Sequence, residues 1–78
     1  MDRQTIVERV VDVMIETFDL EDLAYHDDLV ASDIAGWDSL SNIRFMVAIE
    51  QAFGLRLTMG QWQGLHKVGD LVDLLAKG

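Results

Sequence analysis

Apolar side chains recur at steps of three and four residues in the first part of the chain. An α-helix turns once every 3.6 residues, so this spacing places them along one face and leaves charged residues on the others. The pattern predicts an amphipathic first helix, for which Asp2 is the expected N-cap. The apolar face comprises Ile6, Val7, Val10, Val11, Met14 and Phe18.

Three further helices follow from the same kind of pattern. Apolar spacing predicts a second helix from Ser39 to Phe53, and Gly54 is placed to end it. A short third helix or turn is expected around residues 61–65, and a last helix over residues 68–76.

The segment 19–38 has no sustained period and predicts a long loop between the first two helices. Gly36 gives the backbone freedom that the chain needs just before the second helix. We therefore expect an all-α fold in one domain, residues 1–78: a small four-helix bundle of three main helices and a short third one. Four apolar residues are placed to pin the loop to the bundle: Leu20, Leu23, Leu29 and Ile34.

The short length of the chain limits its chemistry. A domain of 78 residues exposes much of its surface, which disfavours a deep catalytic cleft with a supporting shell. The chain has no cysteine, so it supplies no disulfide, no thiolate metal site and no thiol nucleophile. These features indicate a module on which other proteins act, rather than an enzyme.

Fourteen acidic residues outweigh six basic ones and give a formal net charge of -8. Such a surface repels nucleic acid phosphates and anionic membranes and attracts basic patches on proteins. The sequence shows neither an export signal at its start nor an apolar run of membrane-spanning length. We therefore expect a cytoplasmic monomer that binds basic-faced proteins, and neither nucleic acid nor membrane.

The tripeptide Asp38-Ser39-Leu40 lies where the acidic loop meets the second predicted helix. Asp and Ser are ordinary helix N-caps, so the tripeptide alone is a weak signal. A hydroxyl in the first turn also lies beside the unpaired backbone N–H groups, where the helix dipole favours an attached phosphate. Ser39 is therefore a candidate site of covalent modification.

The wider context of this serine resembles the acyl carrier protein family. The resemblance rests on the run from Gly36 to Ser41, on Asp27-Asp28-Leu29 before it and on the run from Val68 to Val72. It implies that a phosphopantetheinyl transferase moves 4'-phosphopantetheine from coenzyme A onto Ser39. The thiol of this cofactor would hold acyl intermediates as thioesters and deliver them to acyl-loading and acyl-processing enzymes. The domain itself would catalyse nothing.

The resemblance also implies a face for partner enzymes. Asp38 and Leu40 would lie beside the cofactor, and Asp38 would cap the helix and meet a basic patch of the transferase. Ile43 and Val47 match positions that serve both core and partner contact, and we expect them to lie mainly in the core. The predicted partner-binding residues are Asp38, Leu40, Ile43, Arg44, Val47 and Glu50.

The second helix departs from the pattern of fatty-acid carriers. Ser41, Arg44 and Gln51 stand where acids are common, and Arg44 reverses a charge on the docking face. A like charge against a basic partner patch costs affinity. These residues, with Trp37 before the motif, favour a free-standing carrier for a dedicated synthase of a polyketide, specialised lipid or fatty-acid-like pathway.

Two other functions stay open at the level of sequence. A peptidyl or aminoacyl carrier, such as a D-alanyl carrier, would use the same serine. An unmodified helical module could instead dock a partner helix on the exposed Leu40 face. Metal binding is not expected, because His26 and His66 show no ligand spacing and Asp27-Asp28 does not match a calcium loop.

The acidic excess predicts a response to salt. The segment from Asp19 to Asp38 carries seven acidic residues and neither lysine nor arginine. Its self-repulsion weakens the fold at low ionic strength, so added salt or a divalent cation should raise the melting temperature. Thermal unfolding followed by circular dichroism checks this, and an unchanged midpoint across salt concentrations would contradict it.

Overall fold

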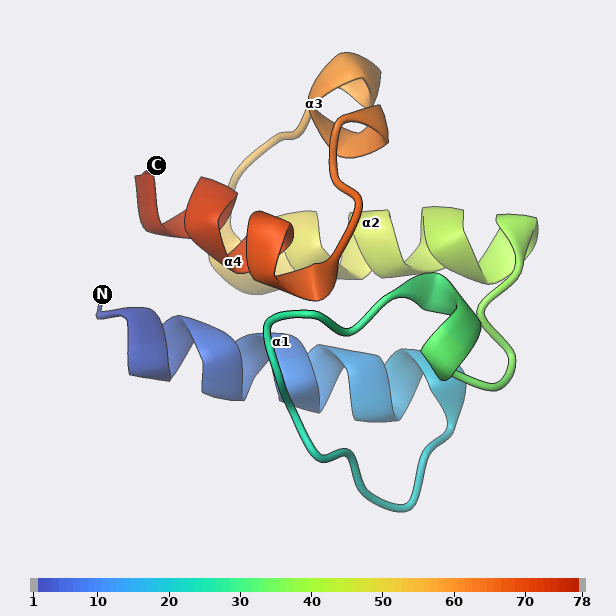
Figure 1. Ribbon diagram of the computed structural model, residues 1–78. Helices are drawn as coiled ribbons and strands as arrows, with labels where there is room; N and C mark the ends of the chain where they lie inside the picture. The colour runs from blue at the N-terminus through green and yellow to red at the C-terminus, as the bar shows by residue number, and fades with distance from the viewer. Residues whose placement is uncertain (1, 78) are drawn as a thin grey trace.

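The computed structural model describes residues 2–77 and is built from helices (Figure 1). In chain order these are α1 (Arg3–Phe18), the 3-10 turn η1 (Ala31–Asp33), α2 (Ser39–Phe53), α3 (Met59–Gln63) and α4 (Val68–Lys77). The all-α architecture with a long loop between α1 and α2 is confirmed. The bounds of α2 match the prediction, α3 begins two residues earlier than residue 61, and η1 was not anticipated.

The long helices pack side by side in Figure 1, with α1 in contact with both α2 and α4. The chain runs along α1 in one direction and returns along α2 in the other, and both ends of the described chain lie on the same side of the bundle. The short helix α3 stands above α2 and α4. No helix within residues 2–77 has both the length and the apolar character needed to cross a bilayer.

Helix ends follow the caps expected from the sequence. The Asp2 carboxylate accepts a hydrogen bond from the Thr5 backbone N–H at 2.8 Å and starts α1. Gly54 ends α2 in the left-handed conformation, with φ at 64°. Asp19 ends α1 in the same conformation, with φ at 54°, which aspartate tolerates better than most residues.

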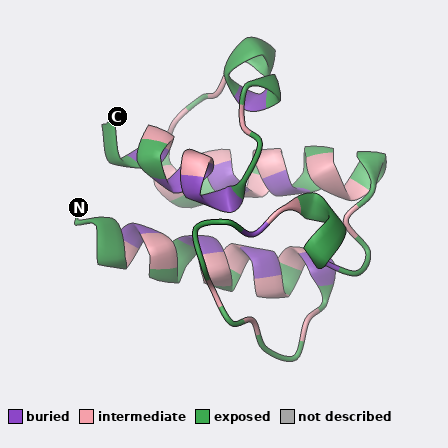
Figure 2. Cartoon of the chain, viewed as in Figure 1, coloured by how far each residue is buried: buried purple, intermediate pink, exposed green. Residues whose placement is uncertain are grey.

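The core draws on all three long helices and on the loop (Figure 2). Leu29 and Ile34 are buried and pin the loop to the bundle, and Leu20 and Leu23 pack partly against it. The largest fully buried side chains are Phe45, Met14, Ile49, Val10 and Val72.

One expectation about the core was wrong. Ile43 and Val47 are 52% and 41% exposed, whereas Phe45 is 1% exposed and lies at the centre of the core. Successive residues of a helix are rotated by about 100°, so Phe45 and Ile49 face one side of α2 and Ile43 and Val47 the other. Because both sides are apolar, spacing alone did not decide which of them packs against α1.

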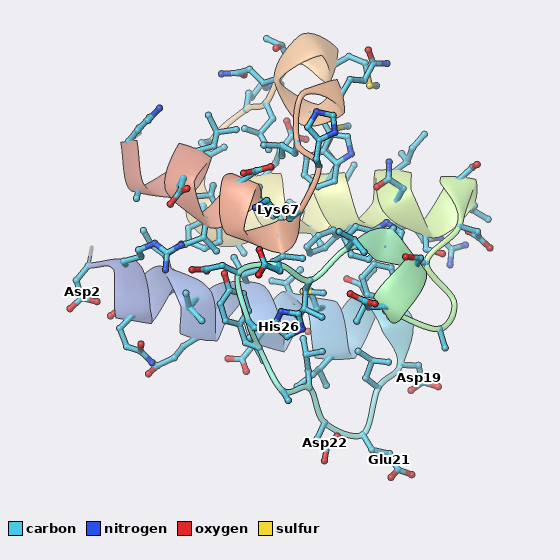
Figure 3. All side chains as sticks on the ribbon, viewed as in Figure 1. Asp2, Asp19, Glu21, Asp22, His26 and Lys67 are labelled. Carbon is cyan, nitrogen blue, oxygen red and sulfur yellow. The ribbon has the colours of Figure 1, made fainter. Side chains whose placement is uncertain are left out.

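Ion pairs hold the acidic loop to the ends of the bundle. The Arg3 guanidinium lies 2.9 Å from the Asp27 carboxylate and 3.3 Å from that of Asp73, and so links α1, the loop and α4. Lys67 lies 3.3 Å from Asp28. Figure 3 shows Lys67 on the side of the loop that faces α4. Asp19, Glu21 and Asp22 lie on the part of the loop that follows α1 and point away from the bundle.

The loop and the start of α4 are in direct backbone contact. The Val68 N–H donates to the Leu29 carbonyl at 2.8 Å, and the Gly69 N–H donates to the Asp27 carbonyl at 3.0 Å. A Cβ atom on Gly69 would lie only 2.6 Å from the Asp27 carbonyl oxygen. Glycine is therefore required here for close packing.

We expect Gly69→Ala to destabilise the protein by about 1–3 kcal/mol, because the added methyl group forces the loop away from α4. Denaturant unfolding measures the change. Gly60→Ala is the matched control, because its Cβ would come no nearer than 4.0 Å to Thr58 Oγ1. Equal stabilities for the two variants would contradict the packing argument.

Candidate functional site

Ser39 is the first residue of α2, and its side chain is exposed. The N-terminus of α2 is capped by Asp38 and Ser41, not by Ser39. The Asp38 carboxylate accepts from the Ser41 backbone N–H at 2.9 Å and from the Ser41 hydroxyl at 2.8 Å. Because Asp38 and Ser41 form the cap, the Ser39 hydroxyl takes no part in these bonds and faces solvent.

The cap also fixes the charge of Asp38. Hydrogen bonds from the Ser41 N–H and hydroxyl lower the pKa of the Asp38 carboxyl below its ordinary value of 3.8. The carboxylate is therefore ionised at neutral pH, directly before Ser39.

Aromatic packing holds the turn before Ser39 against the bundle. The Trp37 ring stacks on Phe18 with centroids 4.9 Å apart and meets the edge of Phe45 at 5.3 Å. Phe45 also contacts Trp62 of α3 at 5.7 Å. The Trp37 indole N–H donates to the Asn42 side-chain oxygen at 3.0 Å, which ties the turn to the next turn of α2. Trp37 thus packs the turn onto the bundle.

Gly36 provides the bend that this packing requires. Its φ of 85° lies in the region that side chains disfavour, and the Ser41 hydroxyl is close to its carbonyl oxygen at 2.5 Å. The sequence indicated Gly36 and Trp37, but it gave no signal for Asn42, since an asparagine on a helix surface carries no pattern of its own.

A small cavity opens beside this turn. Trp37, Asn42, Phe45 and Trp62 line it, with His66 and Lys67 among its polar residues. Its volume of about 120 Å³ is well below the roughly 300–1,000 Å³ of ordinary ligand pockets, so it accommodates only a small group.

The outer face of α2 is apolar. Leu40 is 63% exposed and lies on one stripe with Ile43 and Val47, and the exposed Arg44 lies beside this stripe. Glu50 is half-buried, and its carboxylate accepts a hydrogen bond from the Leu57 backbone N–H at 2.8 Å. Of the predicted partner-binding residues, Glu50 therefore also has a structural role that the sequence did not indicate.

Residues 2–77 contain no group of three or more side chains suited to hold a metal ion. They do suit a phosphate ester on Ser39. Ser39 is exposed and its hydroxyl is not used by the cap. It lies at the N-terminus of a 15-residue helix, the end at which the helix dipole favours negative charge. The fold and site thus define a small acidic helical domain with an exposed serine at the first position of α2.

Comparison with known proteins agrees with this description. A model of the phosphopantetheine attachment site matches residues 4–75, nearly the whole chain. The acyl carrier protein of Saccharopolyspora erythraea is 28% identical over 74 residues, which cover 95% of this chain and 78% of that protein.

The chain belongs to the phosphopantetheine attachment site family, as a carrier of the acyl carrier protein type. The resemblance inferred from the sequence is therefore confirmed. The domain is a non-catalytic carrier, and its cofactor is covalent 4'-phosphopantetheine.

The cap predicts a pH-dependent stability. At neutral pH we expect Asp38→Ala to melt below the wild type, while Asp38→Asn melts close to it, because asparagine also caps helices well. The folded pKa of Asp38 is depressed, so its contribution is complete above the unfolded value of 3.8 and is lost as the pH falls through the folded value.

Melting temperatures of the three proteins from pH 7 to pH 2 check this expectation. The difference between wild type and Asp38→Ala should begin to shrink below about pH 3.8 and disappear as the pH falls through the lower pKa of the folded carboxyl. The difference in melting temperature between Asp38→Ala and Asp38→Asn should change less with pH, because neither variant has a carboxylate at this position. A constant difference between wild type and Asp38→Ala would show that the carboxylate charge does not stabilise α2.

Proposed function

We propose that Ser39 is the residue that bears 4'-phosphopantetheine, and that the protein carries acyl groups as thioesters for a dedicated biosynthetic pathway. The observation that supports this most directly is the exposed Ser39 hydroxyl, outside the Asp38–Ser41 cap, at the first position of α2.

The residues around Ser39 have different roles in keeping it accessible. Asp38 and Ser41 hold the helix start in place, and Trp37 anchors the preceding turn to the core. Leu40 offers an exposed apolar contact beside the modified side chain. When attached, the cofactor supplies a flexible arm with a terminal thiol, a group that this cysteine-free chain lacks.

Partners of two kinds follow from the proposal. A phosphopantetheinyl transferase with a basic face would meet Asp38 and the acidic loop. Acyl-loading and acyl-processing enzymes would bind the exposed stripe of α2. Tethering raises the effective concentration of the cargo at each enzyme that docks the carrier. A polyketide, specialised lipid or fatty-acid-like pathway would fit the departures at Ser41, Arg44 and Gln51.

A second candidate rests on the apolar stripe itself. Leu40, Ile43 and Val47 are large and exposed, as in a helical module that docks a partner without being modified. Modification of Ser39 separates the two functions, because only a carrier requires it.

We expect incubation with coenzyme A and a broad-specificity phosphopantetheinyl transferase to add about 340 Da, the mass of one phosphopantetheine, to the wild-type protein. Intact-mass spectrometry measures the gain. Ser39→Ala should gain nothing, and Ser32→Ala, which removes another exposed serine upstream, should be modified like the wild type. No gain in the wild type would favour the docking module, and a gain in Ser39→Ala would place the attachment elsewhere.

A further inference from the structure

The side-chain amide of Asn42 has an orientation that its neighbour fixes. The Trp37 indole N–H donates to Asn42 Oδ1 at 3.0 Å. An indole nitrogen can only donate, so the amide oxygen of Asn42 has to face Trp37 and its NH2 group has to face away. Within residues 2–77 this NH2 group has no acceptor, and it reaches solvent, because no buried side-chain nitrogen there is left unpaired. Asn42 therefore presents two N–H donors in a defined direction.

Asn42 lies one turn after Ser39 along the same edge of α2. Residues three apart on a helix are neighbours, with Cβ atoms roughly 5–6 Å apart. The next step of three along this edge leads to Phe45, which is buried in the core. A group attached to the Ser39 hydroxyl that bends toward the bundle therefore meets the Asn42 amide before it reaches the core.

The small cavity of the bundle opens at the same place. Trp37, Phe45 and Trp62 form aromatic walls beside Asn42. The cavity volume of about 120 Å³ is below the roughly 150 Å³ of an apolar cavity that binds benzene, so it receives one small apolar group and not a long chain. A hydrogen-bond donor and an apolar recess thus lie next to each other, close to Ser39.

The cofactor carries complementary groups in the part of its arm that is nearest to the phosphate. After the phosphate come a carbon atom with two methyl groups, a hydroxyl group and the first of two amides. The methyl groups favour an apolar surface. The amide carbonyl accepts hydrogen bonds, and so needs a donor such as the NH2 group of Asn42. Both requirements are met within one turn of α2 after the site of attachment.

On the basis of the carrier function proposed above, we propose that Asn42, oriented by Trp37, is a positioning residue for the cofactor arm. Its NH2 group donates to the first amide carbonyl of the arm, and the two methyl groups cover the aromatic mouth of the cavity. These contacts use only the half of the arm near Ser39, so the thiol end stays free. A partner enzyme that draws the arm outward has to break this hydrogen bond.

Three variants separate this role from a purely structural one. Asn42→Asp keeps an oxygen acceptor for the Trp37 indole N–H and removes the donors. Asn42→Ala removes both. Gln51→Glu is the matched control, because it also turns an amide into a carboxylate, at an exposed position near the other end of α2. In the unmodified protein, the indole N–H signal of Trp37 should stay near its wild-type position in Asn42→Asp and move in Asn42→Ala.

The test uses the modified protein, with an unlabelled arm attached to ¹³C,¹⁵N-labelled chain. Isotope-filtered nuclear Overhauser spectra detect contacts between the methyl groups of the arm and the Trp37 ring. We expect these contacts in the wild type and in Gln51→Glu. Asn42→Asp and Asn42→Ala should each weaken them about two- to tenfold, the change expected when one hydrogen bond is removed. Because alanine carries no charge, its effect excludes repulsion of the phosphate as the cause.

Absence of these contacts in the modified wild type would overturn the proposal. Weakening in Asn42→Ala but not in Asn42→Asp would give Asn42 a structural role through Trp37 alone, and equal weakening in Gln51→Glu would show an effect of charge; either result would also overturn it. The mass of each sample is measured first. A wild type without the mass gain contradicts the carrier function itself, whereas a modified protein without the contacts contradicts only the role of Asn42.

Discussion

The structure depends on how Phe45 is packed. This buried ring of α2 contacts Phe18 at the end of α1, Trp37 in the turn before Ser39, and Trp62 of α3. One side chain thus joins two long helices, the turn before Ser39 and the short helix α3. Aromatic rings bury large areas and prefer defined relative orientations, so this cluster restricts the turn more than aliphatic contacts would.

The proposed carrier serine has to be accessible while the backbone around it stays fixed, and different residues meet these two requirements. Asp38 and Ser41 satisfy the backbone at the start of α2, and Trp37 anchors the turn through the core and through Asn42. Ser39 is left without a structural task and keeps its hydroxyl exposed.

Charge is divided in a similar way. The acids of the loop are partly neutralised by Arg3 and Lys67, which use them to hold the loop against α1 and α4. Asp19, Glu21 and Asp22 point away from the bundle, whereas Asp38 caps α2.

The sequence determined the helices, their caps, the long loop and the position of the candidate serine, because helical periodicity and capping are local properties. It did not determine which apolar side of α2 is buried. Phe45 rather than Ile43 or Val47 faces α1, since the orientation of a helix with two apolar sides depends on its neighbours. Local patterns also did not predict contacts between distant segments. These are the packing of Gly69 on Asp27, the stacking of Trp37 on Phe18, and the hydrogen bond from the Leu57 N–H to the Glu50 carboxylate. The tertiary structure decided these contacts, because each requires two segments that only folding brings together.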